Sequence, residues 1–197
     1  MLPAHQNPLR MDLLASVPFR FSHGDWTVNL SWLKRLNYRA SIVGPQGSGK
    51  TTLLAELAER LDNSLYLNLP HEKQPHAAML ADARAGTQAG KIILVDGIER
   101  LSWIQRQGLY FGTAGKAGLV VVVHRKCRLP TWITCRTDEQ LLAHVVGQLG
   151  LDTPTVQAAA LEAFHRSRGN IRDALRLVYD QFANESLPVP SPPLSIS

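Results

Sequence analysis

The feature that most constrains this chain is the glycine-rich segment Gly44–Thr51, which reads GPQGSGKT. It matches the pattern G-x-x-x-x-G-K-[ST] at every fixed position. Before it, Arg39–Val43 is a short apolar run that predicts a buried strand. After it, Lys50–Leu61 carries leucines at helical spacing, which predicts an amphipathic helix. A strand, a tight loop and a helix in this order predict a site that binds phosphate groups.

Each part of this loop has a predicted contact with a bound nucleotide. The glycines allow the backbone to turn so that its N–H groups point at phosphate oxygens. Lys50 is predicted to reach the β- and γ-phosphates, and Thr51 to offer its hydroxyl to Mg²⁺. Thr52 either caps the helix or contacts the α-phosphate. The predicted nucleotide-binding residues of the loop are Gly44, Pro45, Gln46, Gly47, Ser48, Gly49, Lys50, Thr51 and Thr52.

A second part of the predicted site is a carboxylate at the end of another strand. Asp96 follows the continuous apolar run Lys91–Val95, which is the pattern of a strand covered on both faces. At that place Asp96 would hold the Mg²⁺ shell, directly or through water. The alternative is that Asp96 caps the helix that follows.

The order of the periodic segments predicts an α/β fold. Strand and helix signals alternate as far as about Cys135, which favours a parallel sheet with helices on both faces. From Thr137 onward only helical patterns follow. We predict a three-layer α/β/α domain with a mostly parallel sheet of about five strands, and then a small all-helical lid subdomain. The predicted divisions are an N-terminal lead-in segment (1–37, with a short helix at 31–36), the α/β core (38–136), the helical lid (137–185) and a flexible Pro/Ser tail (186–197).

Composition excludes several classes of protein. Hydrophobic residues make up 45% and charged residues 19% of the 197 residues, which is typical of a globular chain. The two cysteines, Cys127 and Cys135, are too few for a disulfide framework or a four-cysteine zinc site, and they fit a reducing compartment. No apolar stretch approaches the ~20 residues that cross a bilayer, and the N-terminus does not have the pattern of a signal peptide. We therefore expect a cytoplasmic protein that has no membrane partner.

Together these motifs resemble those of the additional-strand P-loop ATPases, and most of all the AAA+ group. The resemblance covers roughly Arg39–Ala183. Its motifs are GPQGSGKTT, ILVDGIERL (Ile93–Leu101), the strand ending VVVVH, and GNIRDAL (Gly169–Leu175). It implies ATP as the ligand, with Mg²⁺, and it implies γ-phosphate sensor roles for His124 and Arg172. The alternative is that His124 is an ordinary polar residue at a strand end and that Arg172 is an ordinary residue on a solvated helix.

One position departs from the family pattern. The family places a glutamate directly after the strand-end aspartate, where it polarises the attacking water, whereas this chain has Gly97. Glu99 is the candidate replacement, and its alternative role is that of a first-turn helix charge. Hydrolysis by the implied ATPase would therefore be slow or need a group from a partner. Nucleotide binding does not require this glutamate. In the family an arginine often acts across a subunit interface, and the candidates are Arg125, Arg128 and Arg136.

The sequence leaves three functions open. The first is an ATP-driven molecular switch of the loader or regulator type, which assembles with itself or with a protein partner and for which DNA is a candidate partner. Between Arg100 and Arg136 there are seven Lys or Arg residues and no Asp or Glu, which favours either a nucleic-acid surface or ordinary solvated charge. The second is a small-molecule or nucleotide kinase, whose phosphate loops the GPQGSGKT segment also resembles. The third is a nucleotide-binding module with little hydrolysis, which Gly97 favours.

Overall fold

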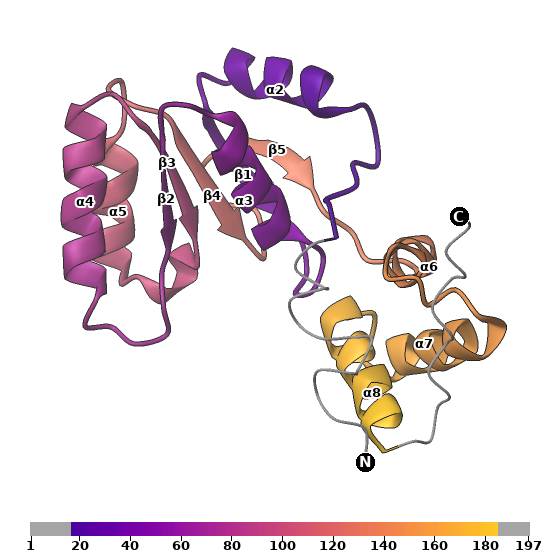
Figure 1. Cartoon of the computed structure of the whole chain (residues 1–197). Coiled ribbons are helices and arrows are strands. Elements are labelled where there is room, and N and C mark those ends of the chain that lie inside the picture. Colours follow the sequence, from indigo (N-terminus) through magenta and orange to yellow (C-terminus); the bar gives the residue numbers. More distant parts are fainter. Residues whose placement is uncertain (1–16, 185–197) are drawn as a thin grey trace, which may run out of the picture. The chain divides into compact units, whose positions relative to one another are not determined.

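The computed structural model describes residues 17–184, and the chain divides into two compact units (Figure 1). The first unit contains Phe19–Gly44 and Gly49–Cys135. Among the described residues, the second contains 17–18, 136–184 and the four loop residues Pro45–Ser48. The predicted tail and the first 16 residues of the predicted lead-in lie outside the described residues.

The first unit is built on a five-stranded sheet in the order β2-β3-β4-β1-β5. The strands are β1 (Arg39–Val43), β2 (Ser64–Asn68), β3 (Ile92–Asp96), β4 (Leu119–Val123) and β5 (Thr131–Thr134). All neighbouring strands pair in parallel. Their carboxyl ends therefore meet at one edge of the sheet, and the predicted parallel sheet is confirmed.

Helices cover both faces of this sheet, as predicted. They are α2 (Trp26–Arg35), α3 (Lys50–Arg60), α4 (His76–Gln88) and α5 (Trp103–Gly112), with a short 3-10 turn η2 (Ile98–Arg100) after β3. Successive strand residues point to opposite faces, so each strand contributes to two apolar cores. In β4, Val120 and Val122 pack with α2 and α3, whereas Val121 and Val123 pack with α4 and α5.

The lead-in differs from its prediction, because α2 begins and ends earlier than the expected short helix. Asp25 caps α2 by accepting a hydrogen bond from the N–H of Val28 at 3.0 Å. The carbonyl of Asn29 accepts a hydrogen bond from Nε1 of Trp132 at 2.9 Å. Trp132 is only 1% exposed, so this bond ties α2 to β5 inside the first unit.

The second unit contains the helices α6 (Glu139–Gln148), α7 (Pro154–Arg166) and α8 (Ile171–Ala183). Each begins at a capping side chain that accepts a backbone hydrogen bond; the caps are Asp138, Thr153 and Asn170. The apolar stripe of α8 forms the centre of a core of its own, where Ala174, Val178 and Phe182 are fully buried. Within residues 17–184 no helix combines the length and the apolar character that a membrane span requires.

Replacing Trp132 with alanine should lower the free energy of unfolding by about 3–5 kcal/mol, because it opens a cavity and removes the bond to Asn29. Urea denaturation followed by circular dichroism measures this change. Trp103→Ala is a matched control, since Trp103 is 68% exposed. The control should change stability by no more than about 0.5 kcal/mol. Equal losses for the two variants would contradict the buried position of Trp132.

Candidate nucleotide-binding site

The glycine loop leads directly into α3, whose first residue is Lys50. Gly47 and Gly49 have positive φ angles of 78° and 80°, which residues with a side chain rarely adopt. Gly49 is the N-cap of α3 and provides no side-chain hydrogen bond to the first turn. The Oγ of Ser48 donates a hydrogen bond to the carbonyl of Pro45 at 2.8 Å, which closes the loop on itself. A helix start that carries no side-chain cap has N–H groups suited to an anion.

Lys50 lies beside the end of β5 and is only 6% exposed. Burial raises the pKa of the Cys135 thiol to about 12, and the nearby Lys50 ammonium opposes this rise. The N–H of Cys135 donates to the carbonyl of Val43 at 2.7 Å, which holds the end of β5 against the end of β1. Cys135 is therefore a neutral thiol at physiological pH. Residues 17–184 contain no cluster of three or more metal-ligating His, Cys, Asp or Glu side chains.

One hydrogen bond joins the first turn of α3 to the end of β3. Oγ1 of Thr51, the second residue of α3, donates to Oδ2 of Asp96 at 2.7 Å. Asp96 is the last residue of β3 and is partly buried. A hydroxyl and a carboxylate are oxygen donors of the kind that Mg²⁺ takes, usually with water completing its shell. This donor set fits Mg²⁺.

The backbone at Gly97 has a conformation that a glutamate would not readily adopt. Gly97 has a φ of 79°, in the left-handed region. A Cβ atom built there would lie 3.0 Å from the carbonyl oxygen of Leu69 and 3.2 Å from the side chain of Arg100. Arg100 in turn donates a hydrogen bond to that same carbonyl. A glutamate at position 97 would therefore be strained and crowded.

The turn after Gly97 brings Glu99 to His124. The Oε1 of Glu99, on η2, lies 3.9 Å from Nε2 of His124, which follows β4. Their side chains are 45% and 52% exposed, so the pair contributes little to stability and is accessible to water. The structure therefore brings four of the predicted site residues together in two pairs, Thr51 with Asp96 and Glu99 with His124. These residues all belong to the first unit, where Asp96 and His124 lie at the carboxyl ends of the adjacent strands β3 and β4.

The predicted arginines occupy different places. Arg172 is the second residue of α8 and belongs to the second unit, as does Arg136, whereas Arg125 is exposed just after His124. Arg128 already has partners: its guanidinium lies 4.7 Å from the centre of the Phe111 ring, and it donates a hydrogen bond to Gln107 at 2.8 Å.

Two residues near Asp96 were missed by the sequence analysis. Asn68, the exposed last residue of β2, lies directly opposite Asp96 in the strand register. Tyr66, on the same strand, has its pKa raised by burial and by the negative charge of Asp96. The sequence does show that Asn68 is a polar residue at the end of a predicted strand. It does not show that this strand lies beside β3, so it could not place Asn68 near Asp96.

Solved structures of RuvB from Thermotoga maritima have the same fold. A point variant of that RuvB aligns over 82% of this chain and 61% of its own, with 22% identity and a TM-score of 0.55. A second structure, described as the RuvB Holliday junction branch migration motor, aligns over 92% of this chain and 64% of its own, with 20% identity and a TM-score of 0.53. The fold is that of an AAA+ P-loop ATPase. This confirms the resemblance found in the motifs at the level of the fold.

The likeness to RuvB is partial in length. This chain spans less than two thirds of either RuvB structure, at 61% and 64%. No protein-family model matches the sequence, and the comparison with curated proteins finds no match.

Replacing Gly97 with alanine should lower the free energy of unfolding by about 1–2 kcal/mol, because a left-handed backbone disfavours a Cβ atom. Gly147→Ala is the matched control, since Gly147 lies in α6 and a Cβ there meets nothing within 4 Å. The control should raise stability by about 0.5–1 kcal/mol. Thermal and urea denaturation measure both. A stabilised Gly97→Ala protein would contradict the left-handed turn.

Proposed function

We propose that this chain binds ATP with Mg²⁺ and acts as an AAA+-like, nucleotide-dependent molecular switch with slow hydrolysis. The observation that carries the proposal is the 2.7 Å hydrogen bond from Thr51 to Asp96, because it sets the end of the phosphate loop against the end of β3. The AAA+ fold supports ATP as the nucleotide by analogy. The chemistry of the loop supports a triphosphate independently of the fold.

In this proposal the loop N–H groups and the N-terminus of α3 bind the phosphates. Lys50 places its positive charge at the β- and γ-phosphates. Thr51 and Asp96 hold Mg²⁺, which supplies charge neutralisation at the phosphates when it is bound.

Glu99 is the proposed general base of hydrolysis. Its carboxylate accepts a proton from the attacking water, and His124, 3.9 Å away, positions that carboxylate and senses the γ-phosphate. Turnover is slow in this proposal because the position directly after Asp96 is Gly97, and the base is Glu99, further along the chain. Arg172 is proposed as a second phosphate sensor on the strength of its G-N-x-R motif alone.

Assembly with further copies, with a protein partner or with DNA belongs to the same proposal. The support is the cationic stretch from Arg100 to Arg136, which has no acidic residue. The T. maritima structure with the same fold is described as a Holliday junction branch migration motor. Sizing the protein with and without ATP, Mg²⁺ and a DNA fragment tests nucleotide-linked assembly and DNA affinity together.

Lys50→Ala should weaken ATP binding at least about tenfold, because the triphosphate loses its main cationic contact. Equilibrium binding of a fluorescent ATP analogue measures this loss, and circular dichroism checks that the fold is kept. Lys73→Ala is the matched control, since Lys73 is exposed and lies outside the site. Unchanged ATP affinity in Lys50→Ala would remove the proposed site.

Glu99→Gln should reduce ATP hydrolysis about a hundredfold or more and leave ATP binding unchanged, because glutamine cannot accept the water proton. Glu59→Gln provides the control, since Glu59 is an exposed residue of α3. Phosphate release is the measurement. If Glu99→Gln and the unaltered protein release phosphate at the same rate, Glu99 is not the base.

The structure also favours a second candidate function, a nucleotide-binding module that barely hydrolyses ATP. The supporting observation is the left-handed backbone at Gly97, which would strain the glutamate that usually stands there. Robust basal phosphate release would rule this module out. Product analysis in the same assay separates an ATPase, which releases inorganic phosphate, from a kinase, which phosphorylates an acceptor.

A further inference from the structure

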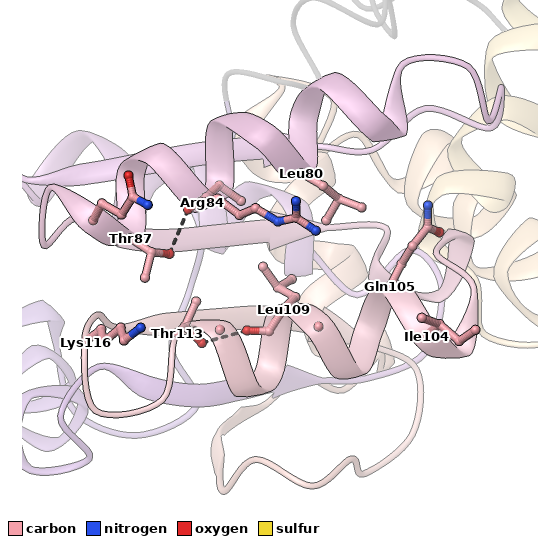
Figure 2. A pocket seen from close by; sticks show the side chains of 12 residues that line it. Leu80, Arg84, Thr87, Ile104, Gln105, Leu109, Thr113 and Lys116 are labelled. Atoms are coloured by element: carbon pink, nitrogen blue, oxygen red, sulfur yellow. Dashed lines mark hydrogen bonds between the residues drawn. The ribbon is translucent and has the colours of Figure 1, made fainter.

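A groove of about 410 Å³ runs between α4 and α5 in the first unit (Figure 2). Apolar side chains from both helices line its length, among them Leu80 and Ala83 of α4 and Leu109 of α5. The buried floor is formed by Ala83 and Leu109 together with Thr87 and Thr113, whose hydroxyls donate hydrogen bonds to the carbonyls of Ala83 and Leu109 within their own helices. Ile104 lies at one end and is 76% exposed, which is unusual for a large aliphatic side chain.

Two glycines of α5 leave this groove open. Gly108 and Gly112 are one helical turn apart, and both line the groove. A Cβ atom built on either would meet nothing within 4 Å, so packing inside the unit does not require glycine at these positions. Glycine in a helix interior lowers stability relative to alanine. The space over α5 is therefore not used by the fold itself.

The charged residues that line the groove are all cationic. Arg84 of α4 and Lys116, just beyond α5, are its only ionisable lining residues, and both are exposed. Throughout residues 17–184, no ion pair and no side-chain hydrogen bond involves either of them. Figure 2 shows Arg84 midway along the groove and Lys116 at the end opposite Ile104.

We propose that this groove binds an amphipathic helix of another protein that carries acidic residues beside its apolar face. An apolar groove between two helices accepts side chains spaced one helical turn apart on a third helix. The cations at Arg84 and Lys116 would then pair with carboxylates on the flanks of the incoming helix. The floor presents no charge to a phosphate backbone, and the hydroxyls of Thr87 and Thr113 donate within their own helices, so the observations favour a peptide over a nucleic acid. The proposal stands apart from the nucleotide site, since none of the lining residues belongs to that site.

The test uses the full chain and two synthetic helical peptides of about 18 residues, a length that supports helix formation. One peptide carries leucines along one face with glutamates on both flanks, and the other has lysines in place of the glutamates. Fluorescence anisotropy of the labelled peptides at physiological ionic strength measures binding. The acidic peptide should bind at least about tenfold more tightly than its lysine counterpart.

Two variants and one control protein locate the binding. Gly108→Leu fills the groove from an exposed helical position and should weaken the acidic peptide at least about tenfold, because it takes the space of an incoming side chain. Gly147→Leu makes the same change in α6, at a site where a Cβ also meets nothing within 4 Å, and should have no effect. The double variant Arg84→Glu, Lys116→Glu alters only exposed side chains and should remove the preference for the acidic peptide. ATP binding should be unchanged in all three proteins, which separates this result from any failure of the nucleotide site.

Three results would overturn the proposal. The first is no binding of the acidic peptide to the unaltered chain. The second is equal binding to the unaltered chain and to Gly108→Leu. The third is that random-sequence DNA displaces the peptide from the unaltered chain but not from the double variant. That result would assign the groove to nucleic acid.

Discussion

The hydrogen bond between Thr51 and Asp96 is the contact on which the rest of the site depends. It joins the first turn of α3 to the end of β3, two segments that do not pair with each other in the sheet. The parallel sheet makes this meeting possible, because all its strands end at the same edge. The strand that precedes the loop, β1, pairs with β4, and β4 pairs with β3. The start of α3, the end of β3 and the end of β4 therefore lie at the same edge of the sheet.

The turn after Asp96 shows how backbone conformation shapes the proposed chemistry. The left-handed φ at Gly97 and the nearby Leu69 carbonyl make the position unsuitable for a residue with a long side chain. The same turn starts η2, which holds Glu99 within 3.9 Å of His124. In the proposed mechanism Glu99, on η2 after β3, takes the place of a carboxylate directly after Asp96. The proposed slow turnover follows from this change of position.

The two faces of the sheet differ in how completely their helices are packed. On the α2 and α3 side, Trp132 and the leucines of α3 fill the space and are almost fully buried. On the α4 and α5 side, the buried core ends at Leu109 and Ala83, and the groove begins above them. Both sides bury an apolar core, and this burial drives folding. The α4 and α5 side in addition leaves apolar surface and two cations available to something outside the unit.

The sequence by itself determined the features that are local. Strands and helices were predicted where such patterns were strong. Examples are the glycine spacing of the loop, the leucine spacing of α3 and the apolar run before Asp96, each of which lies within one segment. The start of α2 was missed although Asp25 is a capping residue type and the apolar pattern of α2 is no weaker than that of α3. Only the tertiary structure decided the strand order, the position of Asn68 opposite Asp96, the approach of Glu99 to His124 and the groove over Gly108. Those features depend on hydrogen bonds and packing between residues that are distant in the chain, and no local pattern encodes which distant partner a strand or helix will take.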